Sequence, residues 1–177
     1  LPSVLPSGYN RAEVTYTDVN GADAEPIVLN KLPLVDDCVD LSKFPISFKN
    51  LQPRTETHGD ISPEAVSGYR KLMNSTESAY VMYQYPDIAD FEVDLHTQGY
   101  ETEIWISPDN LEDSWSRVPL VKTLNGGNEF GLGWKSYVYT PDSYIPAENN
   151  YLKVIYPPFE FDTLQWWSML LNNVIIR

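Results

Sequence analysis

Short segments in which apolar and polar residues alternate follow one another along this chain, and turn residues separate them. Alternation with a period of two is typical of strands that bury one face. The pattern predicts strands at residues 12–19, 46–48, 79–85, 91–96, 102–107, 117–123, 135–140, 151–156 and 173–177. Helical periodicity is weak, and the best candidates for short helices are residues 62–73 and 164–171.

This succession of short strands predicts an all-β fold. Because no crossover helices are visible, a parallel sheet is disfavoured, and we expect an antiparallel two-sheet β-sandwich. Proline and glycine interrupt residues 1–31, which we interpret as a linker or N-terminal extension with one edge strand. Residues 32–177 are then expected to form a single sandwich domain.

Composition narrows the class of partner. The chain has 25 Asp and Glu against 12 Lys and Arg, a formal net charge of −13, which disfavours nucleic acid and anionic membrane surfaces as partners. Aromatic residues make up 13% of the chain, mostly 12 Tyr and 5 Trp, and these amphipathic side chains suit recognition of a neutral ligand. There is no apolar run of the length that spans a membrane. Because the chain begins with Leu1 rather than Met, we expect a mature form or a piece of a longer protein.

The single cysteine, Cys38, excludes a disulfide within the chain and a metal site built from several cysteines. A lone cysteine beside Val39 is expected to be a small buried apolar residue.

The segment at residues 101–115 carries the main candidate for ligand binding. Strand alternation places Ile104 and Ile106 on one face and Trp105 on the other, polar face. A tryptophan on a polar face either covers a core or offers a flat platform to a ligand such as a sugar ring.

Several segments from residue 34 onward share a pattern: LVDDCVDLSKF, AYVMYQY, IWISPDNLEDSW, NNYLKVIY and WWSMLLNNVIIR. With this pattern the chain resembles the β-jelly-roll carbohydrate-binding modules that bacteria attach to secreted polysaccharide-degrading enzymes. Where those modules usually have glycine after the turn aspartate, this chain has Asn110, which also accepts positive φ. The resemblance implies that the sandwich is of the jelly-roll, galactose-binding-like type. It also implies non-catalytic binding of a polysaccharide or oligosaccharide, a catalytic module in the same polypeptide, and a secreted or cell-surface location.

The resemblance also implies a structural calcium ion near one end of the sandwich. Asp36, Asp37 and Asp40 gather oxygen ligands in a short stretch and are the candidate ligands. The alternative for these residues is a solvated acidic loop.

A polar strip is expected beside Trp105. Alternation over residues 91–96 places Phe91, Val93 and Leu95 toward the core. The expected strip, on the opposite face and on the next strand, consists of Glu92, Asp94, His96, Glu103 and Trp105. The alternative is an ordinary solvated sheet face.

The strand at residues 135–140 supplies the remaining candidates for ligand binding. Lys135, Tyr137 and Tyr139 share one of its faces and could stack against a sugar and donate hydrogen bonds to it. The alternative is a tyrosine face packed beneath a neighbouring loop. Other aromatic candidates are the loop residues Trp115, Trp134 and Tyr144, and the adjacent Trp166 and Trp167 in the candidate helix at residues 164–171. His58 lies in a turn-rich loop, and no histidine spacing supports a transition-metal site.

Catalysis is not expected. The string EVDLH resembles the Glu-x-Asp-x-x-Glu strand motif of jelly-roll β-glucanases, but Thr97 stands where the third carboxylate is needed. Two alternatives to glycan binding remain open at this point: a small jelly-roll lyase or hydrolase, and a structural domain that packs on a catalytic module.

Overall fold

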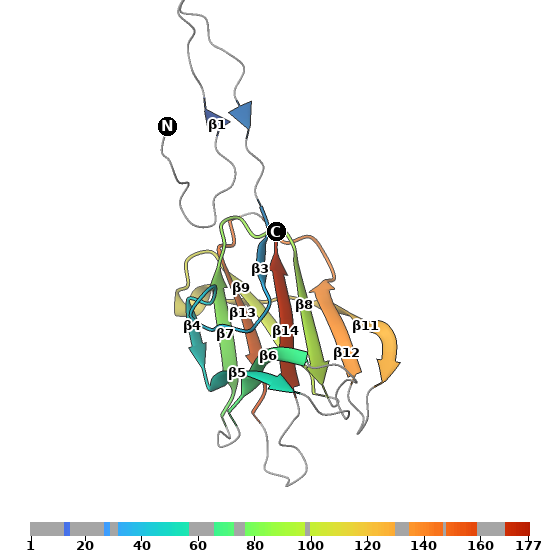
Figure 1. Cartoon of the computed structure of the whole chain (residues 1–177). Helices are drawn as coiled ribbons and strands as arrows, with labels where there is room; N and C mark the ends of the chain where they lie inside the picture. Colours follow the sequence, from blue (N-terminus) through green and yellow to red (C-terminus); the bar gives the residue numbers. More distant parts are fainter. Residues whose placement is uncertain are drawn as a thin grey trace, which may run out of the picture.

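The structure is a computed structural model, and it describes residues 13–14, 27–28, 32–56, 66–72, 77–97, 100–129, 135–146, 148–158 and 169–177. Two antiparallel sheets pack face to face (Figure 1). The predicted all-β, two-sheet sandwich is therefore confirmed. No helix in these described ranges is long and apolar enough to cross a membrane.

The smaller sheet has five strands in the order β10–β9–β13–β7–β4. Its strands are β4 (Ser47–Lys49), β7 (Ala79–Gln84), β9 (Glu103–Ser107), β10 (Ser116–Arg117) and β13 (Tyr151–Tyr156). A short 3₁₀ helix, η1 (Glu112–Ser114), precedes β10. We call this sheet the five-stranded sheet.

The larger sheet has seven strands in the order β11–β12–β8–β14–β6–β5, with β3 also paired to β14. Its strands are β3 (Leu34–Asp36), β5 (Leu51–Glu56), β6 (Val66–Lys71), β8 (Phe91–Thr97), β11 (Leu120–Glu129), β12 (Lys135–Pro141) and β14 (Met169–Ile176). A separate pair joins β1 (Glu13–Val14) to β2 (Ile27–Val28).

The core lies between the two sheets and follows from strand alternation. On β8, Phe91, Val93 and Leu95 are fully buried, as the pattern predicts. Their counterparts from the other sheet include Val81, Tyr83, Ile104, Leu152, Val154 and Tyr156. Cys38 is buried among these residues, as expected for a lone cysteine.

Both helix predictions are wrong where the structure describes them. Residues 66–71 form strand β6, and residues 169–171 belong to strand β14. Pairing between the two strands decides this, because Leu170 and Leu171 lie opposite Arg70 and Tyr69. Tertiary pairing has overridden a weak local preference. The rest of the segment at 164–171 lies outside the described residues.

The predicted strand at residues 117–123 is two strands in different sheets. Arg117 ends β10 in the five-stranded sheet, and Leu120 begins β11 in the seven-stranded sheet. Pro119, which has no N–H to give to a ladder, lies at the crossing. The strands at residues 34–36 and 51–56 were not predicted from the sequence.

Candidate functional site

The polar strip predicted beside Trp105 is divided between two sheets. β8, which carries Glu92, Asp94 and His96, belongs to the seven-stranded sheet, whereas β9 belongs to the five-stranded sheet (Figure 1). The side chains that alternate with the core residues of β8 and β9 therefore point out of opposite faces of the sandwich. The prediction that these residues lie together is wrong, because the chain crosses between the sheets after residue 97.

On the outer face of the seven-stranded sheet, the two carboxylates of β8 accept hydrogen bonds from other residues of the protein. Asp94 accepts hydrogen bonds from Ser136 Oγ at 3.0 Å and from Asn172 Nδ2 at 3.1 Å. The Arg177 guanidinium donates to Glu92 Oε1 at 2.6 Å. His96 is buried, and burial lowers its pKa while the negative charge of Asp94 opposes that shift.

The tyrosines of β12 face the core rather than an open surface. Tyr137 lies opposite Leu95 and Tyr139 opposite Val93, so their side chains point into the space between the sheets. Tyr139 is only 1% exposed, and Tyr137 packs against the core. The prediction that Lys135, Tyr137 and Tyr139 share a face agrees with this alternation. That face is the inner one, so these residues do not join Trp105.

Trp105 lies where strand alternation places it, on the outer face of the five-stranded sheet. Its neighbours Ile104 and Ile106 are 0% and 7% exposed, whereas the Trp105 side chain is half-buried. The indole N–H donates to Glu103 Oε2 at 3.0 Å, and Glu103 Oε1 lies 3.3 Å from Arg117 Nη1. These contacts connect the indole N–H to Glu103 and, through Glu103, to Arg117.

Further aromatic side chains lie on the same outer face. Lys153 of β13 is paired with Trp105 on one side and with Met82 on the other. Its ammonium lies 3.8 Å from the ring centroid of Trp115 and 5.5 Å from that of Tyr80, and burial lowers the pKa of Lys153. We call this surface the aromatic face, defined by Tyr80, Trp105, Trp115, Tyr151 and Lys153.

Sequence reasoning did not assign Tyr80, Tyr151 and Lys153 to this face. A signal for two of them was present, because the string YLKVIY at residues 151–156 alternates as cleanly as β9 does. The pairing of β13 between β9 and β7 cannot be read from that string, and only this pairing brings the three side chains beside Trp105.

The three aspartates proposed as calcium ligands differ in burial and in hydrogen-bond partners. Asp36 is fully buried and accepts hydrogen bonds from Tyr83 Oη at 2.8 Å and from Cys38 N at 2.9 Å. Asp40 accepts from the backbone N and the Oγ of Ser42, and Asp37 is exposed. Within the described part of the chain, no group of three or more His, Cys, Asp or Glu is arranged to hold a metal ion. Calcium binding stays a prediction.

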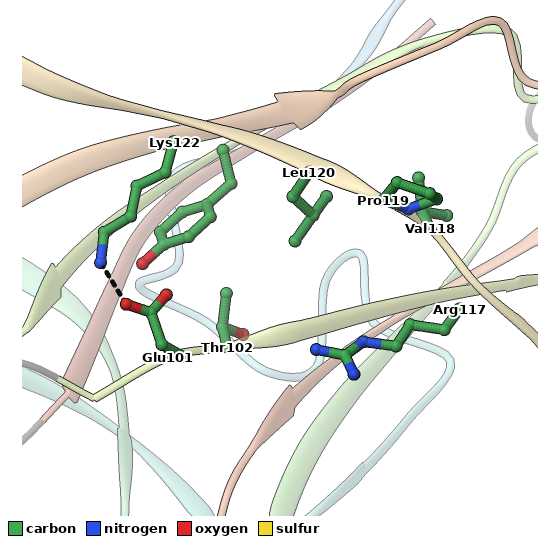
Figure 2. A pocket seen from close by; sticks show the side chains of 8 residues that line it. Glu101, Thr102, Arg117, Val118, Pro119, Leu120 and Lys122 are labelled. Carbon is green, nitrogen blue, oxygen red and sulfur yellow. Dashed lines mark hydrogen bonds and ion pairs between the residues drawn. The ribbon is translucent and has the colours of Figure 1, made fainter.

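A cleft opens at the edge of the sandwich, between the start of β9 and the crossing from β10 to β11 (Figure 2). Its volume is about 410 Å³. We call it the edge cleft, and it is lined by Glu101, Thr102, Arg117, Val118, Pro119, Leu120, Lys122 and Tyr139. The Lys122 ammonium and Glu101 Oε1 are 2.6 Å apart at one end, and Arg117 lies at the other end.

The remaining candidates are only partly placed. Trp115 joins the aromatic face, and Tyr144 is 79% exposed in the loop after β12. His58, Trp134, Trp166 and Trp167 lie outside the described residues.

No protein-family model matches this sequence, and no curated protein matches it. Among solved structures, the chain is similar to the C-terminal CBM6 of LamC, a marine laminarinase from Zobellia galactanivorans. The match has 9% sequence identity and a TM-score of 0.40, and it covers 82% of this chain and 98% of that chain. The similar protein is a carbohydrate-binding module. At this identity and TM-score, the similarity says nothing about the ligand of the present chain.

Proposed function

We propose that this protein binds a polysaccharide or oligosaccharide without catalysis, and that Trp105 on the aromatic face is the main contact. The observation that carries the proposal is an indole that lies on the outer face of a sheet, half-buried, with its N–H fixed by Glu103. Exposed indole surface is disfavoured in water, and sugar C–H groups stack on such a ring. The net charge of −13 favours a neutral glycan over an anionic one.

The expected affinity is modest. Each stacking contact with an aromatic ring contributes roughly 1 kcal/mol, so several rings must act together. Weak binding is useful when the module is tethered, because tethering raises the effective concentration of an attached enzyme at its substrate. The proposal therefore includes an attached glycan-degrading module. It also includes a secreted or cell-surface location and a structural calcium ion, which the resemblance to carbohydrate-binding modules implies.

Catalysis is not part of the proposed function. The carboxylates of Glu92 and Asp94 are engaged by Arg177, Ser136 and Asn172, which supports a structural use of both side chains. Turnover of any glycan by the protein, with loss of that turnover in Glu92→Gln or Asp94→Asn, would contradict this part of the proposal.

The direct test is a glycan array followed by calorimetry with the best ligand. Trp105→Ala should weaken binding by more than tenfold, which corresponds to about 1.4 kcal/mol, and should shift the melting temperature by only a few degrees. Tyr144→Ala removes a more exposed aromatic side chain, from the loop after β12 and not among the residues of the aromatic face, and should leave affinity unchanged.

Three results would count against the proposal. Unchanged affinity in a stable Trp105→Ala variant would place the site elsewhere, and absence of binding to every glycan would favour a domain that only packs on a neighbouring module. A large loss of thermal stability in Trp105→Ala would instead assign the indole to the core.

A further inference from the structure

We propose that the edge cleft is a second carbohydrate subsite, which holds one neutral sugar ring and uses the Tyr139 hydroxyl as a hydrogen-bonding group. This inference rests on the proposed function, because it names a second place at which the same class of ligand binds. The edge cleft lies between the two sheets, whereas the aromatic face lies on the outside of the five-stranded sheet.

The shape and lining of the edge cleft suit a small polar ligand. Its volume of about 410 Å³ is in the lower part of the range for small-molecule sites, which is roughly 300–1,000 Å³. Val118, Pro119 and Leu120 supply an apolar wall, and Thr102 lies across from Leu120 (Figure 2). A sugar ring matches this lining because it carries an apolar C–H face and a rim of hydroxyl groups.

The hydroxyl of Tyr139 is the strongest sign of a ligand. The side chain is 1% exposed and lines the edge cleft, and among the described residues its Oη has no hydrogen-bond partner. Most buried polar atoms in folded proteins are paired, so a buried hydroxyl without a partner calls for an explanation. The Oη is itself buried, so a small shift of the Tyr139 ring toward the edge cleft would let a ligand hydroxyl pair with it. A phenol can both donate to and accept from that hydroxyl.

The charges around the edge cleft balance, which selects for a neutral ligand. Glu101 pairs with Lys122 at 2.6 Å, and Arg117 pairs with Glu103 at 3.3 Å. The Lys122 ammonium also lies 4.1 Å from the ring centroid of Tyr137. With both cations already paired to carboxylates, the edge cleft offers no free charge for an anionic sugar.

The edge cleft and the aromatic face are connected through one ion pair. Arg117 lines the edge cleft, and its partner Glu103 accepts the hydrogen bond from the Trp105 indole. A glycan on the aromatic face therefore lies beside the residue that borders the edge cleft. This continuity favours a sugar over an unrelated small molecule as the occupant.

The test is an NMR titration of the whole ¹⁵N-labelled chain with short neutral gluco-, xylo-, manno- and galacto-oligosaccharides. Backbone amides of Thr102, Val118 and Leu120 report on the edge cleft, and the Trp105 indole N–H reports separately on the aromatic face. We expect saturable shifts of the cleft amides with at least one of these sugars. Tyr139→Phe should weaken that binding about three- to tenfold, the loss expected for one neutral hydrogen bond.

Tyr139→Phe is expected to fold, because it removes only an unpaired hydroxyl, and its melting temperature should equal or exceed that of the parent chain. The inference is overturned if the cleft amides do not shift with any of these neutral sugars, or if Tyr139→Phe leaves their titration unchanged. Failure of the proposed function is a different result, in which the Trp105 indole signal stays still with every sugar.

Discussion

Replacing Asp36 with alanine should destabilise the protein severely, because this carboxylate organises buried polar groups from three separate segments. Asp36 is fully buried and accepts hydrogen bonds from Tyr83 Oη at 2.8 Å, from Tyr69 Oη at 3.0 Å and from Cys38 N at 2.9 Å. Tyr69 Oη also lies 2.9 Å from the backbone oxygen of Asp40, so this hydroxyl has a second acceptor.

The magnitude follows from the donors that Asp36→Ala leaves without a partner. Tyr83 Oη and the Cys38 N–H both lose their acceptor, and each buried unpaired donor costs roughly 1–3 kcal/mol. We therefore expect a loss of about 2–6 kcal/mol in the free energy of unfolding, measured by urea denaturation. Tyr83→Phe removes one donor and leaves the carboxylate its other partners, so its loss should be smaller. A loss below about 1 kcal/mol for Asp36→Ala would refute the argument.

The pH dependence of stability tests the same carboxylate. Burial raises the pKa of Asp36 above its ordinary value of 3.8, and the hydrogen bonds from Cys38, Tyr83 and Tyr69 only partly offset that rise. The folded state therefore binds this proton more tightly than the unfolded chain does. The stability that Asp36 contributes is complete below pH 3.8 and falls as the pH rises through the raised pKa.

Asp36→Asn provides the reference that does not titrate at this position. The unfolding free energy of the parent chain minus that of Asp36→Asn should fall as the pH is raised from about 3 to about 7. Taking this difference removes the contribution of the other carboxylates. A difference that grows with pH would mean that hydrogen bonding outweighs burial at Asp36, and the reasoning would be wrong.

Two further predictions concern the sandwich itself. Gly68→Ala should lower the unfolding free energy by about 1–3 kcal/mol, because the new Cβ would collide with the Leu171 carbonyl oxygen and lie 2.9 Å from Leu170 Cγ. Urea denaturation measures this loss, and Ser116→Ala on the exposed strand β10 is the control. A chain that begins at residue 32 should keep the β-sheet circular dichroism spectrum, because β1 and β2 pair with each other and with no described strand of the sandwich. The spectrum of an unfolded chain would show that the sandwich needs the N-terminal extension to fold.

Local alternation could be predicted from the sequence with accuracy. The inward side chains of β8 and the outward position of Trp105 both follow from a period of two, because neighbouring side chains on a strand must point to opposite faces. Positive φ at Asn110, which measures 62°, follows from the turn chemistry in the same way. These features depend on a few adjacent residues, so the facing of these side chains and the φ of this turn can be predicted from the local sequence.

Strand partners could not be predicted, because pairing depends on how distant segments pack. β8 and β9 are consecutive in the chain, and the natural assumption that they are neighbours placed Asp94 beside Trp105. They lie in different sheets. The same limit applies to Tyr139, because a tyrosine suits either a core or a surface, and only its register with Val93 shows that it faces inward.

The crossing at Val118 and Pro119 explains why the aromatic face and the edge cleft lie next to each other. Arg117 is paired with Trp105 in the five-stranded sheet, and Leu120 is paired with Pro141 in the seven-stranded sheet. The chain therefore leaves one sheet directly beside the indole and enters the other directly beside the tyrosine strand. Because this short connection bridges the gap between the sheets at their edge, it lines the cleft and also anchors Glu103 through Arg117. A change in the length of this connection, or at Arg117 where it begins, would therefore alter both surfaces together.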